Sequence, residues 1–548
     1  MNNSTLRELW QEIYDGDHLE VYEQLMHELS AVKLNRLSPM EPEWFKDAVV
    51  YSLYVDLFNT DFNGLVARLD YLRDLGINCL WLLPILDSPM RDAGFDIRDY
   101  RTIRGDLLPG DERAGQFRSF LKEAHSRGIR IIFDLPLNHT SDEHQWFQEA
   151  LKSPLNRYRD YYIWSDDDSL YSDARIIFEG IEESNWKRIG DVYYFHRFFD
   201  FQPDLNYRNP WVLVEMCRIM LYWVEQGVDG FRADAIPYLW KEDGTDCENL
   251  EKTHLLVKFF RGVLDSVRPH TLLLAEACQK PHEVVRYFGD GDECQAGYHF
   301  PLMPQVFKSI TSGSALPVRS VLHPSVTPPL PDGTQWFTFL RCHDELSLEL
   351  VYVSEEDRAY LHGAYCKEPL WDFRQGQGVS ARLADLLDGN PDKIGLAFSI
   401  ILSLPGTPVI YYGDEFGKRN DRSYYEEQTK LTGKDDTRFL VRGRIDWQGV
   451  ADALADEGSL ESGVLGRVST LLAARNKYKC FGRGDLVWIQ PDVTPAALQD
   501  AVLAFDRILS KEHLRIVHNL SDQPVVITFE DKTTIELAPY GYRWIALK

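Results

Sequence analysis

Residues 227–234 read Gly-Val-Asp-Gly-Phe-Arg-Ala-Asp. A short apolar run here ends in charged side chains, and this pattern determines the expected fold. The same pattern recurs in Leu273-Leu-Ala-Glu276 and in Phe339-Leu-Arg-Cys-His-Asp344. Apolar runs that end in polar residues are typical of buried parallel strands whose carboxyl ends line a site. We therefore expect the three terminal carboxylates to share one cavity.

Eight apolar runs of strand length lie between residues 48 and 412, and amphipathic helical stretches separate most of them. This alternation predicts an α/β fold in which a parallel (β/α)8 TIM barrel closes on itself. An open doubly wound sheet is the structural alternative. It is less favoured, because polar residues follow many strands rather than one switch point. The runs are 48–53, 77–83, 129–133, 228–231, 272–275, 297–300, 336–340 and 408–412.

The pattern changes in three other parts of the chain. Residues 1–43 carry apolar side chains at helical spacing and predict a helical N-terminal extension. Residues 139–206, after the third strand, are rich in Trp, Tyr and Asp and predict an inserted subdomain over the barrel mouth. Residues 478–548 predict a C-terminal antiparallel β-sandwich. The barrel then comprises residues 44–138 and 207–477.

The composition of the 548-residue chain restricts its partners. Its 59 Lys and Arg against 85 Asp and Glu give a net charge of −26, which repels nucleic acid and anionic membrane surfaces. An acidic start without a long apolar run predicts a cytoplasmic protein, and the eight cysteines lack the spacing of a metal site or a disulfide framework. We expect a neutral small-molecule substrate, and the sequence leaves the oligomeric state open.

Two of the carboxylates suit the chemistry of a retaining glycosidase. Such an enzyme needs one carboxylate to attack the anomeric carbon and one carboxylic acid to protonate the leaving oxygen. We assign the first role to Asp234 and the second to Glu276. Arg232 is two residues from Asp234 on the predicted strand, so both side chains point the same way and the guanidinium favours an ionised nucleophile. For any one of these residues alone, a structural ion pair or helix cap is the commoner role.

Four segments at predicted strand ends form an ordered series: Asp134-Leu-Pro-Leu-Asn-His139, Gly230-Phe-Arg-Ala-Asp234, Glu276 and His343-Asp344. In this order they resemble the signature segments of glycoside hydrolase family 13, the α-amylase superfamily, and the resemblance extends from about residue 44 to the end. Residues 171–178 and 288–293 look closest to the trehalose synthase branch. Members of that branch interconvert maltose and trehalose through a glucosyl-enzyme.

The resemblance implies that Asp234 is the nucleophile, Glu276 the acid/base and Asp344 the carboxylate that holds ring hydroxyls. It also implies that His139 and His343 donate hydrogen bonds to a bound glucose. The implied enzyme isomerises short α-glucosides or transfers their glucose. A hydrolytic exo-α-glucosidase is the alternative, because sequence does not show how well water is excluded. A catalytically silent amylase-like binding module is a third reading, which the presence of all three carboxylates disfavours.

Two further segments bear on substrate length. Gly94-Phe-Asp-Ile-Arg-Asp-Tyr100 and Val441-Arg-Gly-Arg-Ile-Asp-Trp447 resemble the segments that carry a paired Asp and Arg in exo-acting members. If Asp96 and Arg442 pair across the pocket, they bind the terminal glucose and the pocket is blind. A structural ion pair is the alternative. With Arg232, these residues complete the predicted sugar-binding set.

Three positions depart from the pattern of the relatives. The calcium loop that relatives carry after the first strand is shortened. Asn138 and Asp204 resemble ligands of the second calcium site of trehalose synthases. Lys241, however, stands where trehalose synthases tend to have an acid, so its ammonium would replace the ion. We expect that no cofactor is required, with structural calcium as the alternative. Residues 418–436 border the acceptor side and also differ, which leaves the choice between isomerase, hydrolase and transferase open.

Overall fold

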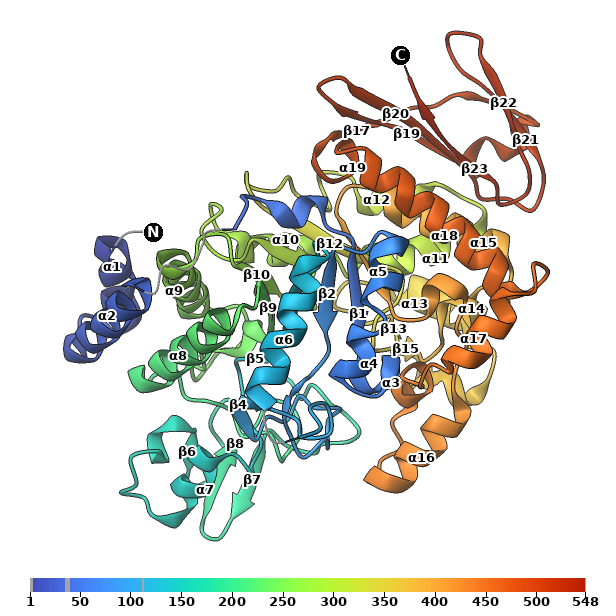
Figure 1. Ribbon diagram of the computed structural model, residues 1–548. Coiled ribbons are helices and arrows are strands. Elements are labelled where there is room, and N and C mark those ends of the chain that lie inside the picture. Colours follow the sequence, from blue (N-terminus) through green and yellow to red (C-terminus); the bar gives the residue numbers. More distant parts are fainter. Residues whose placement is uncertain (1–2, 35–39, 111–112, 548) are drawn as a thin grey trace.

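The computed structural model describes residues 3–34, 40–110 and 113–547 (Figure 1). A closed barrel of eight parallel strands forms its centre, so the predicted barrel is confirmed and the open doubly wound sheet is wrong. Around the barrel the strands are β1 (Val50–Leu53), β2 (Cys79–Leu82), β5 (Arg130–Pro136), β9 (Gly230–Asp234), β10 (Leu272–Ala275), β11 (Ala296–Tyr298), β12 (Gln335–Phe339) and β16 (Thr407–Tyr411).

The register of the barrel strands brings the polar residues to one rim. On β5 and β9, Asp134 lies opposite Arg232. On β9 and β10, Ala233 lies opposite Ala275, so Glu276 is the first residue beyond its strand. Because parallel strands all run the same way, their carboxyl ends meet at the same end of the barrel.

Helix α8 (Pro210–Gln226) shows how local sequence sets the outer layer. The side chain of Asn209 caps its N-terminus, Pro210 occupies the first turn, and Gly227 ends it with φ 110°. The other helices of the barrel region are α3 (Val55–Asn59), α4 (Phe62–Val66), α5 (Leu69–Leu75), α6 (Arg113–Ser126), α9 (Glu251–Val267), α10 (Pro281–Val284), α11 (Leu302–Ser312), α12 (Leu316–Val321), α13 (Glu355–Tyr365), α14 (Leu383–Leu386), α15 (Pro391–Ser403), α16 (Arg422–Thr432), α17 (Trp447–Leu454) and α18 (Leu460–Lys477).

Two N-terminal helices, α1 (Asn3–Ile13) and α2 (Leu19–Leu34), pack on the outside of α8 and α9 (Figure 1). Leu6 and Trp10 are fully buried there, and the rings of Trp10 and Phe259 lie 5.6 Å apart. These helices therefore share the hydrophobic core of the barrel layer.

The segment between β5 and α8 carries helix α7 (Gln145–Lys152) and an antiparallel sheet of β6 (Trp164–Ser165), β8 (Val192–Phe195) and β7 (Trp186–Ile189). Two more small sheets border the barrel mouth. One pairs β3 (Leu86–Asp87) with β4 (Asp99–Ile103), and the other contains β13 (Leu346–Ser347), β15 (Gly378–Val379) and β14 (Asp372–Phe373). These short sheets hold the loops that surround the site.

The C-terminal part follows helix α19 (Cys480–Arg483) and consists of two antiparallel sheets, as predicted. It lies at the end of the molecule opposite the β6–β8–β7 sheet (Figure 1). Within residues 3–34, 40–110 and 113–547, none of the helices combines the length and the apolar character that crossing a bilayer requires. The two sheets are β17 (Asp485–Trp488), β19 (Val502–Leu509), β20 (Glu512–Asn519) and β23 (Tyr542–Ala546), and β18 (Asp492–Thr494), β21 (Val525–Thr528) and β22 (Thr534–Leu537).

Candidate active site

A cavity of about 160 Å³ lies at the carboxyl-terminal rim of the barrel, next to an outer pocket of about 940 Å³. Arg232, Glu276 and Asp344 line the inner cavity. Asp234 contacts Arg232 in its wall and keeps 12% of its side chain exposed. The predicted carboxylates are thus brought to one place, although they are far apart in the sequence. The two spaces share Phe373, Arg374 and Arg438.

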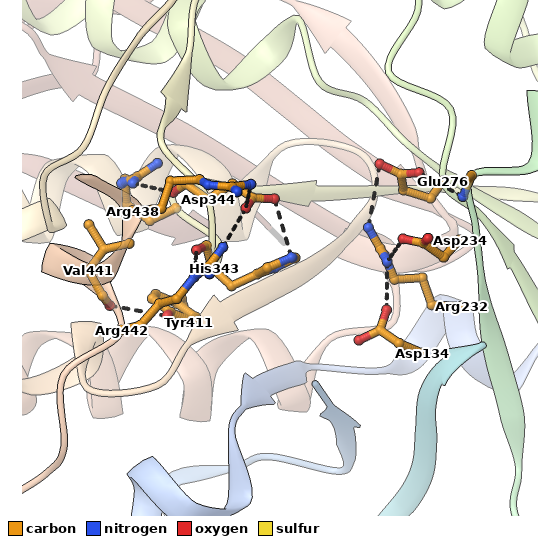
Figure 2. A network of polar contacts seen from close by, with 12 residues as sticks. Asp134, Arg232, Asp234, Glu276, His343, Asp344, Tyr411, Arg438, Val441 and Arg442 are labelled. Atoms are coloured by element: carbon orange, nitrogen blue, oxygen red, sulfur yellow. Dashed lines mark hydrogen bonds and ion pairs between the residues drawn. The ribbon is translucent and has the colours of Figure 1, made fainter. Parts of the chain in front are cut away.

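Arg232 connects three carboxylates at the centre of the site (Figure 2). Its Nη1 donates to Asp134 Oδ1 and to Asp234 Oδ1, both at 2.6 Å, and its Nη2 lies 3.4 Å from Glu276 Oε1. One residue separates Arg232 from Asp234 on β9, so both side chains leave the same face of the strand. Because Asp234 and Glu276 contact one planar guanidinium, they face a common centre.

Glu276 has the environment of an acid that holds its proton near neutrality. Burial raises its pKa to about 7, and although Arg232 lowers the pKa, the negative charge of Asp234 raises it further. Its Oε2 accepts a hydrogen bond from the backbone N–H of Ala235 at 3.1 Å. Glu276 can therefore exist as a carboxylic acid or as a carboxylate at physiological pH.

The pKa of Asp234 differs in part from the expectation. Burial raises its pKa, and the charge and hydrogen bond of Arg232 act in the opposite direction. The guanidinium thus favours the ionised form as predicted, but the net shift is upward because little water reaches the carboxylate. Asp234 is the more strongly paired of the two carboxylates, since its contact with Arg232 is the shorter.

Asp344 is held ionised by three neighbours (Figure 2). Arg442 Nη2 lies 2.9 Å and Arg438 Nη1 3.1 Å from its Oδ1, and His343 Nε2 lies 3.2 Å from its Oδ2. Burial alone would raise the pKa of Asp344, but His343 and the two arginines bring it below its usual range. The outcome is a carboxylate that accepts hydrogen bonds at any physiological pH.

The two predicted sugar-binding histidines are buried and neutral. Burial lowers the pKa of His139, and it lowers the pKa of His343 to about 3. Within the described part of the chain, His139 Nε2 and His343 Nδ1 have no hydrogen-bond partner. The ring of Phe198, which lines the inner cavity, lies 5.1 Å from that of His139. Each histidine thus has one buried nitrogen atom whose hydrogen bonding is unsatisfied within the described residues.

The comparisons with known proteins agree with this geometry. Residues 40–326 match the family model Alpha-amylase, described as alpha amylase, catalytic domain. The chain is 47% identical to trehalose synthase/amylase of Mycolicibacterium smegmatis over 477 residues, which cover 82% of this chain and 79% of that protein. This chain belongs to the alpha-amylase family.

Another alpha-amylase family relative is trehalose synthase/amylase of Mycobacterium tuberculosis, 48% identical over 392 residues that cover 69% of this chain. The match spans 64% of the length of that relative. Among solved structures, an alpha-amylase from H. orenii covers 92% of this chain with a TM-score of 0.71 and 24% identity, and all of that chain is matched. That likeness shows the shared fold.

The predicted pairing of Asp96 with Arg442 across the pocket of this alpha-amylase family member is wrong. Asp96 is fully buried, and it accepts hydrogen bonds from Ser88 Oγ at 2.8 Å and from the backbone of Arg91 and Asp92 at 3.2 Å. Arg442 instead donates to Asp344 and to the carbonyl oxygen of His343. Asp96 therefore organises its own loop and has no free oxygen for a sugar.

Asp92 is the acid that the sequence reading missed. It lines the outer pocket together with Arg438 and Arg442, and Gln202 Nε2 donates to its Oδ2 at 3.0 Å. Its charge contributes to the raised pKa of Asp234, which is due mainly to burial. Sequence periodicity could not single out Asp92, because it and Asp96 flank Gly94, whose φ of 99° turns one irregular loop.

The family's second calcium site is filled by a side chain. Lys241 is buried, and its Nζ lies 2.7 Å from both Asn138 Oδ1 and Asp204 Oδ2. The other oxygen of Asp204 accepts the backbone N–H of Arg197 at 2.9 Å. Since an ammonium occupies the point between the two oxygen donors, these residues do not fit a metal ion.

Proposed function

We propose that this alpha-amylase family member is a retaining enzyme that interconverts maltose and trehalose through a covalent glucosyl-enzyme. The contact of Asp234 and Glu276 with one guanidinium, at the rim of the barrel, carries the proposal. The choice of sugars is supported by the 47–48% identity to two mycobacterial proteins named trehalose synthase/amylase. The net charge of −26 further supports a neutral α-glucoside rather than nucleic acid or a membrane surface as its partner.

In the first step, a carboxylate oxygen of Asp234 attacks the anomeric carbon of maltose as the bond to the leaving glucose breaks. Glu276 gives its proton to the leaving oxygen. Asp344, ionised and fixed by Arg438 and Arg442, accepts hydrogen bonds from the ring hydroxyls while the sugar passes through an oxocarbenium-like state. The result is a glucosyl ester on Asp234 and a free glucose in the outer part of the site.

In the second step, the released glucose turns and presents its anomeric hydroxyl to Glu276. Glu276, now a carboxylate, takes the hydroxyl proton as the oxygen attacks the glucosyl carbon and displaces Asp234. The product is trehalose, and both carboxyl groups return to their first protonation state. Water attack at the same carbon yields glucose instead, so exclusion of water sets the balance between the two products.

We infer that Asp92 and Arg442 contact the terminal glucose, in place of Asp96 and Arg442. The position of Asp92 in the outer pocket wall with Arg442 supports this role. The unpartnered nitrogen atoms of His139 and His343 support their assignment as donors to glucose hydroxyls.

We also propose that the protein requires no calcium, because the ammonium of Lys241 supplies the positive charge between Asn138 and Asp204. The two 2.7 Å contacts of this ammonium support the proposal. A cytoplasmic location is proposed too, and the free thiols of the eight cysteines are typical of a reducing compartment.

The decisive test is to incubate the protein separately with maltose, trehalose and sucrose and to follow the products by NMR. We expect trehalose from maltose with little net loss of disaccharide, and no product from an Asp234→Asn variant. Glucose as the sole product of maltose would assign the protein as a hydrolytic exo-α-glucosidase. No turnover of any of the three sugars would favour a silent binding module.

A further inference from the structure

A stack of three phenylalanine rings forms the wall that the inserted segment presents to the active site. Phe178 and Phe199 lie 4.2 Å apart at 17°, and Phe199 and Phe201 lie 5.1 Å apart at 11°. All three are buried in one small cluster. Phe178 lines the inner cavity and Phe199 the outer pocket, so the stack lies between these two spaces.

Three cations from outside the inserted segment lie over this stack, and one of them, Arg91, has its Cζ 4.4 Å from the ring centre of Phe201. Lys434 Nζ is 3.9 Å from the ring centre of Phe199 and 4.1 Å from that of Phe201. Arg374 Cζ is 4.4 Å from the ring centre of Phe178. Arg374 follows strand β14 and Lys434 follows helix α16, so both belong to loops outside the inserted segment.

The ammonium of Lys434 contacts aromatic rings rather than a carboxylate. Among the described residues, no carboxylate lies within 4.0 Å of its Nζ. Asp92, Glu182 and Asp200 are close enough to favour its positive charge, although burial lowers the pKa of Lys434. An ammonium over the face of an aromatic ring is attracted by the electron density of that face.

Arg374 and Lys434 differ in their access to the reacting sugar. Arg374 lines the inner cavity, so it is placed to touch the substrate. Lys434 lines the outer pocket and a third pocket behind it, but not the inner cavity. Lys434 therefore does not contact the glucosyl group in the inner cavity, and its ring contacts connect it to that cavity through the phenylalanine stack.

We propose that Lys434 is a positioning residue that fastens the inserted segment over the active site, and that it thereby sets how often the glucosyl-enzyme reacts with the retained glucose rather than with water. This proposal rests on the proposed function. The location of Lys434 fits this role, because it lines the outer pocket next to the inner cavity. Loosening this contact admits water to the glucosyl-enzyme without removing a group that contacts it.

The test compares Lys434→Met with Lys434→Arg and with Lys430→Met. Methionine keeps the length of the side chain and loses the charge, whereas arginine keeps the cation. Lys430 is exposed on helix α16, which precedes Lys434, and it has no ring contact among the described residues, so it is the matched control. The readout is the ratio of glucose to trehalose formed from maltose, measured by NMR together with the rate of maltose consumption.

We expect Lys434→Met to raise the share of glucose roughly two- to fivefold, the range that the loss of one cation–π contact allows. Maltose consumption should change less than this ratio, and the other two variants should match the parent. An unchanged ratio in a folded Lys434→Met protein would overturn the proposal. Phe199→Leu, which keeps the apolar bulk and removes the ring face, gives a second route and should shift the ratio in the same direction.

The products of the parent test the proposed function, and the product ratios of the variants test the role of Lys434. If the parent makes neither trehalose nor glucose from maltose, the proposed function is wrong. If the parent makes trehalose but all variants share its product ratio, the proposed function is supported and the proposed role of Lys434 is wrong.

Discussion

Glu276 and Asp344 line one cavity but differ in charge because their neighbours differ. Asp344 touches two guanidinium groups and a histidine, whereas Glu276 has a single longer contact with Arg232. Burial then dominates at Glu276 and raises its pKa to about 7, while the cations dominate at Asp344 and lower its pKa. Different surroundings give neighbouring acids different pKa values, so one site can supply both a proton donor and a permanently ionised carboxylate.

This difference predicts the pH profile of the enzyme. Glu276 must be protonated for the first step, so kcat/KM for maltose should fall as the pH rises above about 7, where Glu276 loses its proton. Loss of activity at low pH should reflect protonation of Asp234. The measurement is kcat/KM across pH for the parent and for Glu276→Gln, with α-glucosyl fluoride as a donor whose leaving group needs little protonation. An alkaline limb that persists unchanged in Glu276→Gln would contradict the assignment.

The buried ammonium of Lys241 predicts how the protein responds to calcium. Replacing it in Lys241→Met leaves the carboxylate of Asp204 buried without a counter-charge, which should cost roughly 3–5 kcal/mol of unfolding free energy. Lys241→Asp adds an oxygen donor, so calcium should raise the Tm of that variant. The check is thermal unfolding with calcium and with EDTA. A parent protein that loses activity or Tm in EDTA would contradict the proposed role of Lys241.

The sequence predicted the positions of Asp234 and Glu276 at strand ends but not the contacts of Asp96, which bonds within its own loop rather than to Arg442, and the reason is physical. Asp234 and Glu276 sit at strand ends, where strand register fixes their direction. Asp92 and Asp96 belong to one irregular loop in which Met90, Ala93 and Gly94 all have positive φ. Which acid of such a loop faces the pocket depends on these turns, and periodicity carries no information about them.

Among the elements, the barrel strands were predictable because each is a short, fully buried apolar run between helical stretches. Strand β11 was the weakest signal, and it contains three residues. The loops of the mouth were not predictable. In the small β13–β15–β14 sheet, the two-residue strand β13 pairs Leu346 with Val379 and Ser347 with Gly378 of β15, more than 30 residues along the chain, and such short pairings leave no periodic signal.

Helix α1 gives a prediction about stability that is separate from catalysis. Trp10 is fully buried against Phe259 of α9, so Trp10→Ala should lower the unfolding free energy by roughly 3–5 kcal/mol. Glu12 is exposed on the same helix, and Glu12→Ala should change it by less than about 0.5 kcal/mol. Urea unfolding of the three proteins measures both values. Equal stability of Trp10→Ala and the parent would show that α1 does not contribute to the barrel layer.

In the whole molecule, the barrel, the inserted segment and the C-terminal sheets occupy different positions relative to the site. The barrel brings Asp234, Glu276 and Asp344 to one rim, and the inserted segment with the loops after β14 and α16 covers that rim. The C-terminal sheets dock at the other end, where Gln335 at the start of β12 donates to the carbonyl oxygen of Gly482. The proposed catalytic residues and the segments around them thus lie at one end of the barrel.

The central claim is that Asp234 forms a covalent bond with glucose. The most direct measurement is mass spectrometry of Glu276→Gln after reaction with α-glucosyl fluoride, because this variant forms the ester and hydrolyses it slowly. We predict an added anhydroglucose unit on the peptide that contains Asp234, and none in Asp234→Asn. An adduct on another carboxylate, or turnover of the fluoride with initial release of β-glucose and no adduct, would contradict the account.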